Sequence, residues 1–345
     1  FSYLFPNGCC ARRARRTLGG GHYPIPPTTE FAFSRSPDYN RGYYNPDIEY
    51  EPWVSSGSRT FTNQTPTATP WDPIADNTTF QIDLTQSLTT APDWAWQFLL
   101  MPGMRDENNN LYAGPPVYRT FPYFPATYWL VDDTATMSIA GTPVDCANPT
   151  PATYELFRAY ANLVTVSAEA IVSDGTCLVR YEIDTATVVY PSGRTYAEEI
   201  QNFANWFSYY RKRHQAMRGG ITAAFDEIDG VRVAEFTINS RQNVTMRSLT
   251  DQRVAILDDI FEARGSGGTP LRESIDWLGR QFERSGSTAP ITQACQKNYG
   301  GAFTDGFANN SSTGVGNRDA GFGVPYEDAW SNTLADVAME YYDDL

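Results

Sequence analysis

The chain has 345 residues and a formal net charge of -14, because 26 Lys and Arg residues stand against 40 Asp and Glu residues. Such an acidic chain is not expected to bind nucleic acid, whose phosphates attract basic surfaces. Hydrophobic residues make up 41% of the sequence, enough to bury one or two cores, and no apolar run approaches the roughly 18 residues that a membrane span requires.

Residues 1–54 are rich in Pro, Tyr and Arg and predict an extended segment that packs on the core. An arginine-rich stretch at 12–16 predicts a solvated loop, because no aromatic stacking platform is interleaved with it. The aromatic residues of the segment either pack on the domain, which we favour, or form a recognition surface. They are Tyr39, Tyr43, Tyr44, Tyr50 and Trp53. Since the chain starts at Phe1 without an initiator Met or a signal peptide, we expect a processed form or a piece of a longer protein.

Residues 55–192 are rich in Thr and aromatic residues and predict a β-rich module. Strands are expected at 79–84, 95–101, 127–132, 163–173, 177–183 and 187–190. Asp174-Gly175 lies between two alternating apolar runs and is the strongest hairpin signal in the sequence. One helix is expected around 154–162.

Five cysteines in a Lys-poor chain suit an exported protein, in which disulfides persist. Cys146 and Cys177 flank one segment and are the candidate bridge. Cys9 and Cys10 are adjacent, and Cys295 is left over, so the odd count leaves a free thiol or a partner outside the chain. No cysteine or histidine spacing typical of a structural zinc site is present.

Residues 193–345 alternate between strand and helix patterns, which favours a sheet with helices on its faces. A long amphipathic helix is expected to begin near Thr195, which has the capping-box spacing to Glu198. Its predicted apolar face carries Ile200, Phe203, Phe207, Tyr210, His214 and Met217, and the opposite face carries Arg211, Arg213 and Arg218. We expect Gly219-Gly220 to weaken the helix beyond Arg218.

The remaining elements of this part follow in order. After the Asp229-Gly230 turn, residues 231–238 predict a buried strand. A helix is then expected with Leu249, Val254, Leu257, Ile260 and Phe261 on its apolar side. A glycine-rich turn at 265–268 is expected to lead through Thr269-Pro270 into a helix at 271–282. A strand is expected at 299–303, before Thr304-Asp305-Gly306, and a last helix is expected around 331–341.

An ordered set of short segments resembles the type IV pilus tip-associated adhesins and pilus biogenesis proteins of the PilY/PilC family. The segments are Tyr43–Trp53, Phe124–Tyr128, Gln201–Arg211, Gly268–Arg272, Cys295–Asn298, Thr304–Gly306 and Ser331–Met339. The resemblance implies an α/β fold, a von Willebrand A-like doubly wound sheet with helices on both faces that carries an inserted β-rich module. In this family a β-propeller normally follows, so the chain is interpreted as an N-terminal portion.

The same resemblance implies an ion-dependent adhesion site, in which oxygen ligands hold Mg²⁺ or Ca²⁺. Thr269 matches the family's threonine ligand and Asp305 its aspartate, but the DxSxS loop of the family is not found in its usual place, so the site is incomplete. The nearest internal match is Asp132, Thr134 and Thr136, for which a polar strand-end turn is the favoured alternative. For Thr269 and Asp305 the alternatives are a helix cap and a turn.

A second loop invites comparison with a calcium site. Residues 106–110 have the acidic and amide residues that open a calcium loop, but Leu111 and Val117 occupy its glycine and bidentate-acid positions, so a solvated loop is preferred.

The function implied is non-enzymatic. A protein of this family primes pilus assembly by meeting minor pilins and then contacts a host or abiotic surface receptor, which places it in the periplasm, on the outer cell surface and at the pilus tip. The sequence has only two histidines, His22 and His214, and no metalloprotease, nucleophile-elbow or phosphate-loop motif. Two alternatives stay open: a von Willebrand A-like binding module unrelated to pili, and the non-catalytic part of a secreted hydrolase.

Overall fold

The structure is a computed structural model. It describes residues 4, 29–74, 81–88, 96–103, 110–121, 123–134, 136–139, 142–148, 169–171, 175–187, 189–263, 267–304, 308–309 and 313–343. The chain divides into two compact units: Phe1–Trp53 with Phe61–Gln215, and Val54–Thr60 with Ala216–Leu345. Both helices and small sheets are present, which confirms the prediction of a mixed helix and sheet protein.

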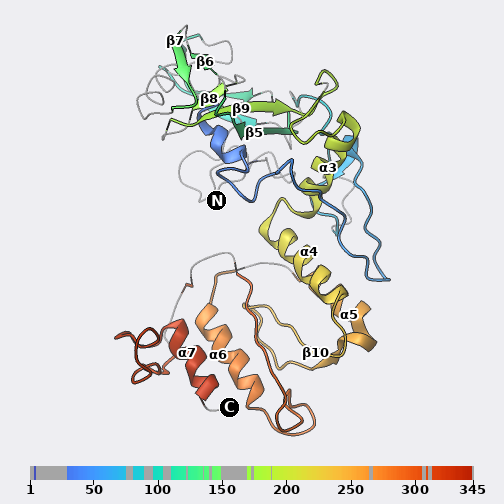
Figure 1. Cartoon of the computed structure of the whole chain (residues 1–345), viewed down its shortest axis with the longest axis vertical. Helices are drawn as coiled ribbons and strands as arrows, with labels where there is room; N and C mark the ends of the chain where they lie inside the picture. The colour runs from blue at the N-terminus through green and yellow to red at the C-terminus, as the bar shows by residue number, and fades with distance from the viewer. Residues whose placement is uncertain are drawn as a thin grey trace. The chain divides into compact units, whose positions relative to one another are not determined.

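Helix α3 (Tyr196–Tyr209), labelled in Figure 1, contributes several residues, among them Phe203 and Trp206, to the hydrophobic core of the first unit. The predicted capping box is confirmed, because the Thr195 side chain accepts from the Glu198 backbone while the Glu198 side chain accepts from the Thr195 backbone. The helix is buried on more than the predicted face: its polar residues Glu199, Asn202 and Asn205 are buried as well. A helix so enclosed must satisfy its polar side chains with protein partners.

The largest sheet of the first unit has the strand order β5-β9-β8 and is antiparallel throughout. Its strands are β5 (Thr127–Val131), β8 (Glu169–Ile171) and β9 (Cys177–Glu182). The pairing of β8 with β9 confirms the predicted hairpin, and Gly175 in the connection has a φ of 91°, which glycine adopts without strain.

The other strands of the first unit form two-stranded antiparallel sheets. They pair β1 (Thr69–Pro70) with β2 (Gln81–Ile82), β3 (Trp96–Leu100) with β4 (Val117–Phe121), and β6 (Thr136–Ile139) with β7 (Thr142–Asp145). The described residues of 187–190 form no strand, so that prediction is wrong, and the helix expected at 154–162 lies outside the described residues.

The aromatic residues before α3 pack on the domain, as the favoured interpretation predicted. Tyr43 and Tyr44 are fully buried and Trp53 nearly so. Their polar atoms are also satisfied: the Tyr44 hydroxyl donates to Glu199 Oε1 at 2.9 Å, and the Trp53 indole nitrogen to the Tyr209 carbonyl at 3.0 Å. Tyr39 differs, since 40% of its surface is exposed.

The predicted single helix from Thr195 to Arg218 is two helices. After α3 the backbone leaves helical geometry near Tyr210, and α4 (Arg213–Asp226) begins with the Gln215 side chain accepting from the Lys212 backbone at 3.0 Å. Gly219-Gly220 does not end α4, which continues to Asp226. Arg218, expected on the solvent face, is buried, because the break changes which residues α4 turns inward.

In the described residues of the second unit, the sheet that the sequence predicted does not form. Of the expected strand at 231–238 only β10 (Arg232–Val233) forms, paired antiparallel with β11 (Arg247–Ser248), and residues 299–303 form no strand. All strand pairs in the described residues are antiparallel, whereas a doubly wound sheet requires parallel neighbours. The von Willebrand A-like arrangement is therefore not confirmed. Residues such as Val231 and Tyr299 are exposed, so burial does not drive strand formation there.

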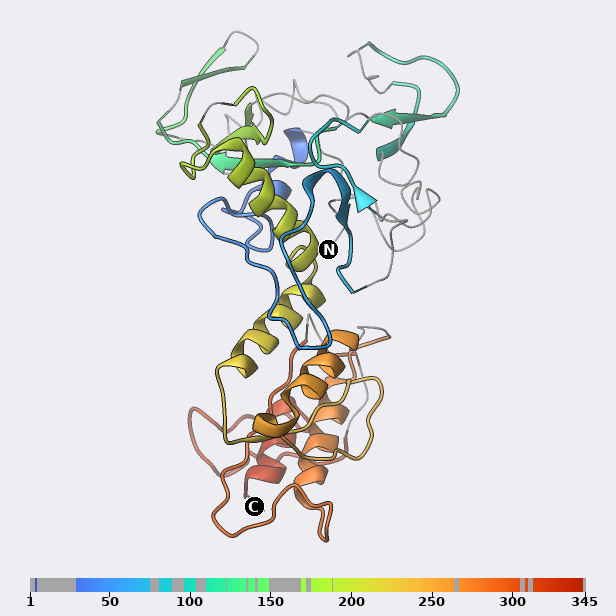
Figure 2. The same cartoon turned by 90° about the vertical axis from the view of Figure 1, so that its right-hand side faces the viewer.

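Three helices complete the second unit: α5 (Leu249–Glu262), α6 (Leu271–Phe282) and α7 (Leu334–Asp343). Orange α6 and red α7 lie side by side in Figure 1 and Figure 2. Gly279 permits this approach, because a Cβ atom there would lie 2.1 Å from the Tyr341 ring. On α5 the predicted apolar side is buried except for Val254, which is 47% exposed.

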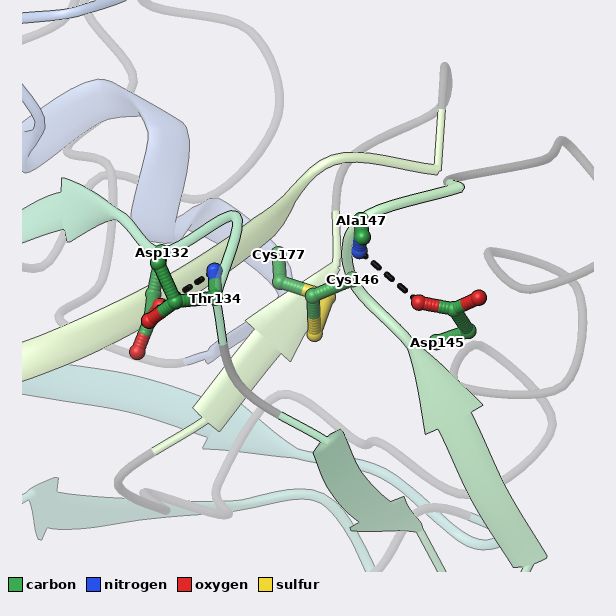
Figure 3. Close-up of a disulfide and its surroundings, with 6 residues drawn as sticks. All are labelled: Asp132, Thr134, Asp145, Cys146, Ala147 and Cys177. Carbon is green, nitrogen blue, oxygen red and sulfur yellow. Dashed lines mark hydrogen bonds between the residues drawn. A yellow bond between two sulfur atoms is a disulfide. The ribbon is translucent and has the colours of Figure 1, made fainter.

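The predicted disulfide is confirmed. Cys146 and Cys177 are bonded, with their Cα atoms 5.5 Å apart, and join the end of β7 to the start of β9 (Figure 3). Cys295 is a free, exposed thiol, and Cys9 and Cys10 lie outside the described residues. Within the described part of the chain, no helix has the length and apolar character to cross a membrane.

Candidate functional site

The glycine-rich turn before α6 brings together segments that are distant in the sequence. Asn239 donates to the Gly268 carbonyl at 2.7 Å, and the Asn309 side chain accepts from the Thr269 backbone, whose carbonyl accepts from the Asn309 backbone at 2.9 Å. Gly268 must be small here, since a Cβ atom would lie 2.8 Å from Asn309 Oδ1. The turn is therefore held by two asparagines that sequence reasoning did not single out.

Of the two residues predicted to hold an ion, the structure describes Thr269. Its backbone is bound by Asn309, four residues after Asp305, but Asp305 itself lies outside the described residues. The helix-cap alternative fails, because Pro270 is the cap residue of α6 and no side-chain cap bond forms. In the described ranges no three carboxylate, imidazole or thiol side chains gather in a way that could hold a metal. The Thr269 and Asp305 site thus stays a prediction.

The internal alternative, at Asp132, is a polar turn. Asp132 Oδ1 accepts from the Thr134 backbone and from the Thr134 hydroxyl, both at 2.9 Å (Figure 3). A carboxylate that closes a local turn in this way is typical of a strand end. The favoured interpretation is confirmed here. Of the loop that opens at Asp106, residues 106–109 lie outside the described residues.

A loop of residues 316–332, called the display loop below, carries four exposed apolar side chains within nine residues. Its ends are joined by the Asn332 backbone donating to the Gly316 carbonyl at 2.7 Å and by Gly316 donating to Asn332 Oδ1 at 2.9 Å. Between these ends Phe322 is 46% exposed, Val324 95%, Tyr326 71% and Trp330 74%. Large exposed apolar groups on a closed loop are typical of a protein-binding surface.

Sequence reasoning did not single out the display loop. The one signal was the run of aromatic residues between glycines and a proline at 321–330, which has neither a helix nor a strand period.

The break between α3 and α4 has unusual electrostatics. Lys212 Nζ lies 3.9 Å from the Trp71 ring centre, and Arg211 lies 4.0 Å from that of Phe207. Burial, together with the neighbouring Arg211 charge, lowers the pKa of Lys212 to about 6. Burial likewise lowers the pKa of Arg211 to about 9. The poorly solvated place thus disfavours the charged form of both side chains, and the aromatic faces offset part of the cost when they are charged.

Comparison with known proteins identifies relatives. The chain is 32% identical over 180 residues to the type IV pilus biogenesis factor PilY1 of Pseudomonas aeruginosa strain PAK, a match that covers 42% of the chain and 16% of that protein. PilY1 of strain PAO1 is 27% identical over 241 residues, or 58% of the chain and 20% of the relative. PilY1 of strain UCBPP-PA14 is 26% identical over 167 residues, covering 41% and 14%.

The chain matches only a fifth or less of the length of these relatives. No family model and no solved structure matches it. The three relatives confirm the resemblance to the PilY/PilC family that the sequence segments suggested.

Proposed function

From this PilY1-like character we propose that the chain is part of a type IV pilus biogenesis factor, and that it acts by binding other proteins rather than by catalysis. The observation that carries the proposal is the similarity to three PilY1 proteins, each described as a pilus biogenesis factor. It favours this function over a binding module unrelated to pili and over a secreted hydrolase. In this proposal the chain meets minor pilins during assembly and a surface or host receptor at the pilus tip.

The display loop supports a binding role. Its exposed aromatic residues, Tyr326 and Trp330, are of the types enriched in protein interfaces. Acidic Glu327 and Asp328 lie between them, so a partner with an apolar pocket and a basic rim would be complementary. Mg²⁺ or Ca²⁺ at Thr269 and Asp305 stays part of the proposal, as a second contact for a partner's carboxylate.

The test is capture of purified minor pilins by the immobilised chain, together with retention of the chain on purified pili. We expect both with the wild type, and weaker capture with Trp330→Ala. Tyr299→Ala is the matched control, because Tyr299 is also highly exposed in the second unit but lies outside the display loop. Failure of both capture and retention would remove the pilus function. If Trp330→Ala and Tyr299→Ala weakened the capture of minor pilins equally, the display loop would have no specific part in binding them.

A further inference from the structure

A buried carboxylate at the base of the display loop has no hydrogen-bond partner in the described part of the chain. Asp319 is 1% exposed, and neither Oδ1 nor Oδ2 accepts a hydrogen bond from a described residue. None of the basic side chains in the described ranges forms an ion pair with it; the adjacent Arg318 pairs with Glu340. A buried carboxylate that stays charged without a partner is strongly disfavoured, so a compensating cation would stabilise it.

Other unsatisfied oxygens lie in the same short segment. Asn317 Oδ1 and Thr313 Oγ1 are buried and also lack hydrogen-bond partners among the described residues. Asn317 and Asp319 are two residues apart, and Thr313 lies four residues before Asn317. All three orphaned groups end in oxygen, and none of the three side chains carries a positive charge.

The backbone around these oxygens is already fixed. The Arg318 backbone donates to Asp336 Oδ1 at 2.6 Å, and the Asn317 amide donates to the Asp328 carbonyl at 3.1 Å, which leaves its Oδ1 able to accept from a ligand. Gly314 and Gly316 have φ values of 79° and 84°, so glycines bend the segment where side chains would resist. Ligand oxygens that are held in place before an ion arrives lose little conformational entropy on binding.

We propose that Asp319, with Asn317 and Thr313, forms a cation site at the base of the display loop, and that its ion is Ca²⁺. Oxygen ligands on a bent loop suit this hard cation, which tolerates irregular geometry better than Mg²⁺ does. A single carboxylate among neutral oxygens gives weak binding, with a dissociation constant on the order of 0.1–1 mM, as in extracellular modules. The site is separate in sequence from Thr269 and Asp305 and does not depend on the proposed function.

Binding at this site would stabilise the display loop in its folded form. Asn317 and Asp319 follow the Gly316–Asn332 closure directly, so an ion there would fix the end from which the exposed aromatic residues extend.

The test is calcium titration of the chelator-treated full chain by calorimetry, with melting temperature as a second readout. We expect millimolar Ca²⁺ to raise the melting temperature of the second unit by about 3–5 °C and Mg²⁺ to have a smaller effect. Asp319→Asn keeps the shape of the side chain but removes its charge, and should weaken calcium binding by roughly tenfold or more. Glu327→Gln, on the same loop and exposed, should bind calcium as the wild type does.

A further variant separates the outcomes. If Asp319→Asn does not fold, Asn317→Asp replaces it in the test; it adds a charged ligand and should bind calcium at least roughly threefold more tightly. The proposal is overturned if the wild type does not bind calcium, if Asp319→Asn binds as well as the wild type, or if Asn317→Asp gives no gain.

Discussion

Replacing Gly279 by Ala should destabilise the contact between α6 and α7. The new Cβ atom would lie 2.1 Å from Tyr341 Cδ2 and 2.2 Å from its Cγ, so the ring must move by more than an ångström to reach ordinary contact. That movement would break the 2.7 Å hydrogen bond from the Tyr341 hydroxyl to Asp276 Oδ1. Overpacking costs about 1–3 kcal/mol and a hydrogen bond to a charged group about 1.5–3 kcal/mol, against a helix gain of about 1 kcal/mol. The net loss should be roughly 2–4 kcal/mol.

Gly220→Ala is the control, because it should raise the free energy of unfolding rather than lower it. Gly220 is exposed inside α4, and no atom lies within 4 Å of the position that an added Cβ would take, so alanine should stabilise by about 0.5–1 kcal/mol. Urea denaturation followed by circular dichroism would measure the free energy of unfolding. Hydrogen exchange of the peptide covering α6 would locate the loss in the second unit.

A double-mutant cycle decides whether the ring is the cause. In a Tyr341→Ala background, Gly279→Ala should cost less than about 1 kcal/mol, because no ring remains to be displaced. If Gly279→Ala were as stable as the wild type, or equally costly in both backgrounds, the close packing of α6 on α7 through Gly279 would be refuted.

Three other perturbations test the first unit. Asn205→Ala should cost about 2–3 kcal/mol in urea denaturation, since it removes the partners of the Tyr50 carbonyl, at 2.8 Å, and of the Gln64 backbone, at 3.0 Å. A loss below about 0.5 kcal/mol would contradict this expectation. Replacing Cys146 by Ser should lower the free energy of unfolding by about 3–4 kcal/mol, because the bond closes a separation of 31 residues; a wild type equally stable with and without reductant would disagree. Because the folded pKa of Lys212 is about 6 against an ordinary 10.5, the unfolded chain binds more protons between these values, and stability should rise with pH across that window. Lys212→Met should flatten the rise, and an unchanged pH profile would refute the assignment.

The candidate sites show where sequence patterns stop being informative. Thr269 was found through its motif, but Asn239 and Asn309, which hold its turn, have no signal of their own: an isolated asparagine looks the same whether it is solvated or bound to a distant backbone. Asp319 is similar, because nothing around it in the sequence distinguishes a buried acid from the many exposed ones.

The sequence by itself determined the features that depend on neighbouring residues. The capping box at Thr195, the bounds of α6 and the β8–β9 hairpin follow from hydrogen-bonding and backbone preferences over a few positions. Tertiary structure alone decided whether residues 231–238 and 299–303 become strands, because a strand forms only when a distant segment pairs with it. It also decided that Arg218 is buried and that the Asp319 carboxylate is left without a hydrogen-bond donor among the described residues, since both depend on surroundings brought together by the fold.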